Sequence, residues 1–151
     1  MARTSDRKNQ ILQTLAQMLE GPAAEKITTA ALAKQLDVSE AALYRHFSGK
    51  AQMFEGLIDF IEQTLFALIN KITSEEKSGL RQCESIIGVL LGFAQKNRGM
   101  TRVLIGDALV NEDEKLQIRI NQLHERLEAT LRQALRFAMG ANEVEIGRAH
   151  V

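Results

Sequence analysis

Residues 27–50 read ITTAALAKQLDVSEAALYRHFSGK, and this stretch decides the fold. Two short amphipathic segments, 27–36 and 39–47, are separated only by Asp37 and Val38. Thr28 and Ser39 stand where each segment begins, and their hydroxyls suit an N-cap because they accept a hydrogen bond from a backbone N–H of the first turn. Ala33 is small where the two segments would approach closely. The pattern therefore predicts two helices joined by a tight turn, a helix-turn-helix.

The flanking sequence predicts further helices and no strands. Apolar residues recur at helical spacing over 6–19, 50–72, 80–97, 100–110 and 113–139. Gly21-Pro22 ends the first of these, and Gly49 is expected to end the 39–47 helix with left-handed C-cap geometry. Arg119, Arg126, Glu128 and Arg132 are expected on a solvated face of the last helix. We predict an all-α chain with a three-helix domain over 1–49 and an antiparallel helical bundle over 50–142.

Composition and charge restrict the function only weakly. The 151 residues carry 19 basic and 19 acidic side chains, so the whole chain is neutral, and residues 1–50 have a net charge of +2. This distribution permits a nucleic-acid partner in the amino-terminal part without requiring one. Cys83 is the single cysteine, which excludes an intrachain disulfide; we expect it to be a small buried hydrophobic residue. With a polar start and no long apolar run, the expected compartment is the cytoplasm, with no membrane partner.

The outward face of the 39–47 helix is the candidate DNA-reading surface. At about 100° per residue, Ala41 and Arg45 lie opposite the core residue Leu43. Arg45 can donate two hydrogen bonds to guanine, and alanines can contact thymine methyl groups. Hydroxyl and basic groups nearby suit phosphates. The full candidate set is Thr28, Thr29, Ser39, Ala41, Ala42, Tyr44, Arg45, His46 and Lys50. The alternative is that LYRHF is simply an amphipathic helix with a polar outer face.

Two runs of sequence carry a resemblance to a known family. Residues 27–62, with LYRHF followed by Lys50, resemble the DNA-binding domain of the TetR family, and residues 90–136 resemble the SlmA-type nucleoid occlusion factors within it. The resemblance implies a homodimer that binds near-palindromic double-stranded DNA at the nucleoid. It also implies that the DNA-bound form binds FtsZ, the bacterial tubulin homologue, and prevents a division ring from assembling over the chromosome.

The same resemblance implies where FtsZ would bind. The matching positions lie on the helices predicted over 50–72 and 80–97: Phe60, Val89, Gly92, Lys96 and Asn97. The alternatives are a core role for Phe60 and Val89, close helix packing at Gly92, and a C-cap loop at Lys96 and Asn97. The chain departs from the family pattern at Asp37, where glycine is usual, at Arg98, where proline is usual, and at Lys96, where arginine is usual.

Two other functions compete with this interpretation. A ligand-responsive TetR-type repressor would need an apolar pocket among the later helices, and their apolar faces are equally consistent with a filled core. An enzyme would need a site, and the sequence has no glycine-rich phosphate loop, no metal-ligand cluster and no nucleophile with a suitable base. We therefore expect no catalytic activity, no cofactor and no metal.

The carboxy-terminal residues 143–151 break the helical pattern. EIGRAHV, residues 145–151, equals the translation of a common sequencing-adapter sequence. We expect this tail to be non-native and the bundle to be truncated after its last helix. Two further helices, through which TetR-type chains mainly dimerise, would then be missing.

Overall fold

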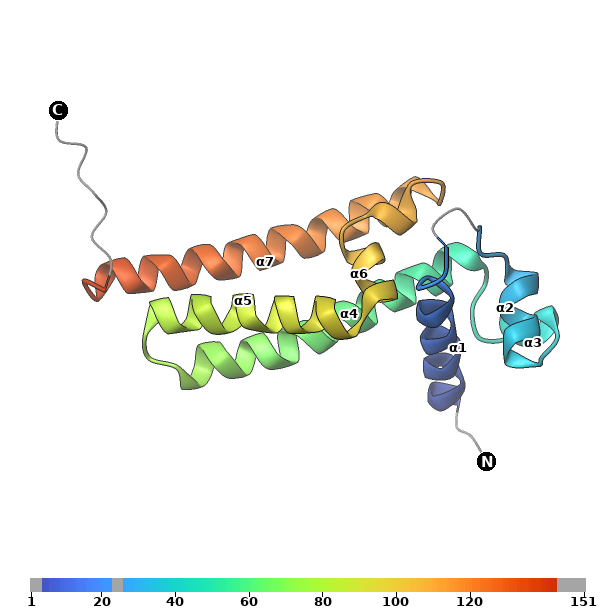
Figure 1. Ribbon diagram of the computed structural model, residues 1–151, viewed down its shortest axis with the longest axis horizontal. Helices are drawn as coiled ribbons and strands as arrows, with labels where there is room; N and C mark the ends of the chain where they lie inside the picture. The colour runs from blue at the N-terminus through green and yellow to red at the C-terminus, as the bar shows by residue number, and fades with distance from the viewer. Residues whose placement is uncertain (1–3, 23–25, 144–151) are drawn as a thin grey trace.

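A computed structural model describes residues 4–22 and 26–143, and all regular structure in these ranges is helical. The elements are α1 (Thr4–Met18), α2 (Thr29–Leu36), α3 (Glu40–Tyr44), α4 (Lys50–Glu75), α5 (Gly79–Lys96), α6 (Arg98–Leu104), the 3-10 helix η1 (Asp107–Leu109) and α7 (Glu114–Gly140). Helices α1–α3 form a head at one end of an elongated body, in which α4, α5 and α7 lie side by side (Figure 1).

The head has its own apolar centre. Leu15, Leu32 and Leu43, one from each of α1, α2 and α3, are each about 1% exposed. Phe47 follows α3 and is also buried, against Gly56 of α4. Each such side chain stabilises the fold by roughly 1.5–3 kcal/mol through the apolar surface it removes from water. The predicted three-helix unit is therefore packed directly on the beginning of α4.

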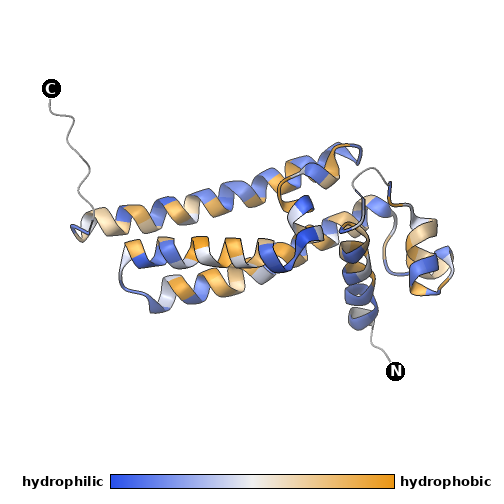
Figure 2. Ribbon diagram, viewed as in Figure 1, coloured by the Kyte–Doolittle hydropathy of each residue, from blue (hydrophilic) through white to orange (hydrophobic). Residues whose placement is uncertain are grey.

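The body is held by side chains that fill the space between its helices. Figure 2 shows hydrophobic residues along the facing sides of these helices and hydrophilic residues along much of α7. Ile61, Leu65 and Ile69 of α4, Ile86 of α5 and Ile120 of α7 have no exposed surface. These facing sides therefore form a packed core.

Two predictions about the end of the 39–47 helix were wrong. The helix predicted over 39–47 ends at Tyr44, and the chain continues as a turn in which the N–H groups of His46 and Phe47 both bond to the carbonyl of Leu43. The turn accompanies the burial of Phe47. Gly49 has an extended backbone, φ 177° and ψ 179°, and precedes α4 as its N-cap. It is not a left-handed C-cap.

The helix predicted over 100–110 is interrupted. Gly106 has φ 85°, a left-handed conformation that favours glycine, and it separates α6 from η1. A Cβ at this position would lie 3.1 Å from Oε1 of Gln117. The chain thus turns sharply between α6 and α7 instead of running straight.

The solvated face predicted for α7 was wrong for one of its four residues: the Arg119 side chain is only 20% exposed, whereas the Arg126 side chain is 49% exposed. Arg119 reaches α4, where it donates to Asp59 at 2.8 Å and to Glu62 at 2.5 Å, while Arg126 lies 3.4 Å from Glu62 and stacks on Phe66. Burial raises the pKa of Glu62, but the hydrogen bonds and charges of the two arginines outweigh it and hold that pKa below its ordinary value. Glu128 and Arg132 pair with each other on the exposed side, as predicted.

Residues 144–151, most of the predicted tail, lie outside the described residues. Glu143 is described, and its carboxylate accepts hydrogen bonds from Ser78 Oγ and from the N–H of Gly79. In the described part of the chain, none of the helices combines the length and apolar character needed to cross a membrane.

Candidate nucleic-acid interface and partner surface

The turn between α2 and α3 sets the geometry of the candidate interface. Asp37 adopts a left-handed conformation, φ 55° and ψ 47°. This lets its own N–H bond to the carbonyl of Lys34 at 3.1 Å and the N–H of Val38 bond to that of Ala33 at 3.0 Å. Asp tolerates this conformation better than most residues, so the turn keeps its form without the usual glycine.

The two predicted N-caps are confirmed. Thr28 Oγ1 accepts from the N–H of Ala31 at 3.0 Å, and Ser39 Oγ accepts from the N–H of Ala42 at 3.2 Å. A hydroxyl that accepts in this way keeps its own proton, so both groups can still donate to a phosphate oxygen. Capping and DNA contact are therefore compatible roles for these two side chains.

A chain of hydrogen bonds joins α2 to α3 on the candidate DNA-facing side. Thr29 Oγ1 donates to Glu40 Oε2 at 3.2 Å and lies 3.3 Å from the hydroxyl of Tyr44. Because Thr29 has a single hydroxyl proton, Tyr44 is the donor in the second bond. A phosphate oxygen that accepts a hydrogen bond from either hydroxyl must therefore break one bond of this chain.

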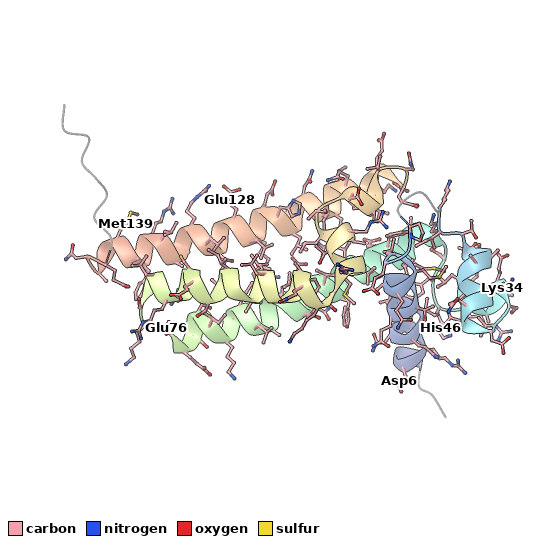
Figure 3. The ribbon with its side chains drawn as sticks, viewed as in Figure 1. Asp6, Lys34, His46, Glu76, Glu128 and Met139 are labelled. Carbon is pink, nitrogen blue, oxygen red and sulfur yellow. The ribbon has the colours of Figure 1, made fainter. Side chains whose placement is uncertain are left out.

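The candidate reading residues differ in exposure. Ala41, Tyr44 and Arg45 are exposed and Ala42 is half-buried. His46 lies in the head beside α1, whereas Lys34 lies on its outer side (Figure 3). Nδ1 of His46 is buried and has no hydrogen-bond partner, so this ring nitrogen faces protein.

Lys50, in the first turn of α4, forms an ion pair with a residue of the body. Its Nζ lies 2.7 Å from Oε1 of Glu112, in the connector between η1 and α7. The ammonium also lies 5.9 Å from the centre of the Phe54 ring. Sequence reasoning missed Glu112, because nothing local in a connector indicates that it meets a residue 62 positions earlier.

The candidate partner residues come from α4 (Phe60), from α5 (Val89, Gly92 and Lys96) and from the C-cap of α5 (Asn97). Phe60 and Asn97 line one hollow of about 350 Å³ between α1, α4, α5 and α6. Val89 is half-buried and packs on the core, whereas Lys96 is exposed at the end of α5. The structure therefore brings Phe60 and Asn97 to one hollow, and Val89, Gly92 and Lys96 do not line it.

Two of the alternatives for these residues are resolved. A Cβ on Gly92 would meet nothing within 4 Å, so this glycine does not serve close helix packing. Asn97 is the C-cap of α5, and its Nδ2 donates to the carbonyl of Phe93 at 3.1 Å. The alternative C-cap role therefore holds for Asn97.

Head and body are joined by contacts that the sequence did not reveal. Arg102 of α6 donates to the carbonyl of Leu19 at 2.8 Å and pairs with Asp107 at the same distance. Gly99 lies so close to α1 that a Cβ would be 1.9 Å from the carbonyl oxygen of Ala16. Glycine near the start of a helix, where propensity disfavours it, was the one available signal.

Comparison with known proteins supports the assignment of both parts. Residues 11–57 match the sequence profile of bacterial regulatory proteins of the tetR family, and residues 77–143 match the SlmA-like profile of the tetracyclin repressor-like C-terminal domain. The chain is 58% identical over 134 residues to the nucleoid occlusion factor SlmA of Alteromonas mediterranea, covering 89% of this chain and 69% of that protein. The chain belongs to the SlmA family of nucleoid occlusion factors.

Further relatives support the same family, and a solved structure shares the fold. SlmA of Marinomonas sp. is 55% identical over 136 residues, and SlmA of Vibrio cholerae is 57% identical over 132 residues; these matches cover 90% and 87% of this chain and 69% and 67% of the relatives. The crystal structure of the TetR family transcriptional regulator PfmR from Thermus thermophilus superposes with a TM-score of 0.76 at 20% identity, over 90% of this chain and 74% of that one. At this identity the superposition shows that the TetR fold is shared.

Proposed function

We propose that this SlmA-family chain is a sequence-specific DNA-binding protein that, when bound to DNA, antagonises assembly of FtsZ over the nucleoid, and that it acts as a homodimer. The observation that carries the DNA-binding part is the outward side of α2–α3. There Ala41, Tyr44 and Arg45 are exposed beside two N-cap hydroxyls. A short helix presented in this way fits the major groove.

The charge distribution supports a local DNA contact. The chain is neutral as a whole, so general attraction to DNA is weak and binding must rest on particular side chains. Arg45 is suited to base recognition, whereas Thr28, Ser39 and Lys50 are suited to the phosphate backbone. Sequence selectivity should therefore depend on Arg45 more than on the other three.

A second surface leaves room for a protein partner at the same time. None of the nine candidate DNA-binding residues lines the hollow that contains Phe60 and Asn97. Gly92 and Lys96 directly precede Phe93 and Asn97, which line the hollow, and the open space at Gly92 would let a partner backbone approach α5 closely. We propose Phe60, Val89, Gly92, Lys96 and Asn97 as the FtsZ surface, with 1–49 as the DNA-binding domain and 50–142 as the partner-binding domain.

The test measures FtsZ polymers by sedimentation, with and without a duplex that the protein selects from a random pool. We expect polymer loss only when both protein and duplex are present. Arg45→Ala should abolish the effect by weakening DNA binding by about 1–3 kcal/mol. Lys96→Ala should abolish it while leaving DNA binding intact, and Lys115→Ala, an exposed lysine on α7, is the matched control.

The outcomes separate the two halves of the proposal. DNA binding without any effect on FtsZ would contradict the FtsZ half and favour a TetR-type repressor. Failure to bind any duplex at low salt would contradict the DNA half. Equal effects of Lys96→Ala and Lys115→Ala would contradict the assigned partner surface.

A further inference from the structure

Lys50 differs from the other candidate phosphate contacts because a carboxylate already neutralises it. Its Nζ lies 2.7 Å from Oε1 of Glu112, and the two side chains are only 21% and 15% exposed. Water and salt screen such a pair less than a fully exposed one. A phosphate that approaches the Lys50 ammonium also approaches the Glu112 carboxylate, and the two anions repel each other.

The backbone at Glu112 is held by hydrogen bonds in the connector and at its two ends. Its N–H bonds to the carbonyl of Leu109 at 3.0 Å, which closes the turn after η1, and the next residue, Asp113, caps α7 through the N–H of Lys115. Just before this connector, the Arg102 guanidinium pairs with Asp107 of η1 at 2.8 Å and donates to the carbonyl of Leu19, which follows α1. Figure 1 shows this connector at the end of the body that adjoins the head. The backbone therefore keeps the Glu112 carboxylate close to the Lys50 ammonium before DNA arrives.

We infer that Glu112 sets the affinity of this protein for DNA, by competing with a DNA phosphate for the ammonium of Lys50. The inference rests on the proposed DNA binding. DNA binding then exchanges one partner of Lys50 for another and releases the connector between η1 and α7 from the first turn of α4. Removing the charge of Glu112 should strengthen DNA binding although it weakens the fold. If Glu112 instead positioned Lys50 for DNA, its removal would weaken DNA binding.

The experiment measures binding of a fluorescent duplex of about 20 base pairs of mixed sequence by anisotropy, over a range of salt concentrations. Glu112→Gln should bind about two- to fivefold more tightly than the unchanged chain, the range expected from the strength of a partly exposed ion pair. Lys50→Gln should bind more weakly. The negative slope of the logarithm of the binding constant against the logarithm of the salt concentration should become shallower by about 0.9. The double variant should behave as Lys50→Gln does. Glu114→Gln removes a neighbouring exposed charge and is the matched control.

Two results would overturn the inference. One is that Glu112→Gln binds no more tightly than Glu114→Gln. The other is that Glu112→Gln strengthens binding equally in the Lys50→Gln background, which would mean general electrostatics rather than competition for one ammonium. Thermal unfolding checks the fold of each variant, and Glu112→Asp, which shortens the side chain by one carbon, replaces Glu112→Gln if the latter does not fold. No binding by the unchanged chain at low salt would contradict the proposed function itself.

Discussion

Gly99 of α6 packs directly against the backbone of α1, where the body contacts the head. A Cβ built on it would lie 1.9 Å from the carbonyl oxygen of Ala16 and 3.2 Å from Cβ of Leu19. Backbone atoms cannot yield as a flexible side chain does. We therefore expect Gly99→Ala to lower the free energy of unfolding by about 1–3 kcal/mol, the usual range for overpacking, as measured by urea denaturation.

Gly88 is the matched control for this substitution. It lies within α5, and a Cβ there would meet nothing within 4 Å. Gly88→Ala should raise the free energy of unfolding by about 0.4–1 kcal/mol, because alanine has less conformational freedom to lose than glycine. Equal effects of the two substitutions would show that α6 does not pack on α1 as described.

Glu143 ties the end of α7 to the start of α5. Its carboxylate accepts hydrogen bonds from Ser78 Oγ, Gly79 N–H and Leu80 N–H. The bond from Ser78, followed by the two backbone bonds, lowers the pKa of Glu143 below its ordinary value of 4.5. A carboxyl group whose pKa is lower in the folded state stabilises the fold fully when the pH is above its pKa in the unfolded state. This stabilisation is lost as the pH falls through its pKa in the folded state.

Glu143→Gln should therefore destabilise the protein at pH 7, and its difference from the unchanged chain should shrink as the pH falls below about 4.5. Thermal unfolding across this pH range gives the difference directly. Ser78→Ala removes the main partner and should reduce the effect of Glu143→Gln. A difference that stays constant from pH 7 to pH 3 would contradict the proposed role of this carboxylate.

Among the elements, the turn between α2 and α3 restricts which residues can stand at position 37. Asp37 has φ 55°, where a β-branched side chain clashes with its own backbone. Asp37→Val should lower the free energy of unfolding by about 1–2 kcal/mol, the cost of a left-handed residue. Asp37→Gly removes the same charge without that clash and should change stability by less than about 0.5 kcal/mol.

The pair of variants is compared by thermal unfolding and by DNA binding. If α2 and α3 depend on this turn for their relative angle, Asp37→Val should also weaken DNA binding more than Asp37→Gly does. Equal DNA binding by two variants of unequal stability would mean that the angle between α2 and α3 is set by the packing of Leu32 and Leu43 instead.

At the scale of the whole molecule, α5 presents an apolar stripe to solvent. Leu80, Ile87 and Leu91 recur at helical spacing and are 42%, 47% and 66% exposed. Contiguous exposed apolar surface favours association. We expect the 151-residue chain to self-associate with rising concentration in sedimentation velocity. Ile87→Lys with Leu91→Lys should weaken this at least about tenfold.

Val110→Lys is the control for the stripe. Val110 is more exposed, at 76%, but it lies on the connector after η1 and not on α5. This substitution adds the same kind of charge and should leave association unchanged. A chain that stays monomeric at all concentrations, or that responds equally to both kinds of substitution, would show that the α5 stripe is not an association surface.

The sequence by itself determined those features that depend on neighbours along the chain. The hydroxyls of Thr28 and Ser39 cap the helices that they precede, and Asp37 makes the turn, because these interactions span only a few residues. Helical periodicity placed α1, α4, α5 and α7 to within a few residues. The resemblance over 27–62 and 90–136 then indicated the family.

Only the tertiary structure decided what depends on residues far apart in the chain. The turn after Tyr44 accompanies the burial of Phe47, and Arg119 leaves the solvated face of α7 for Glu62 of α4. The pairing of Lys50 with Glu112 is of the same kind. Periodicity shows which face of a helix is apolar but not which element that face will meet, because the meeting is decided by packing of the whole chain.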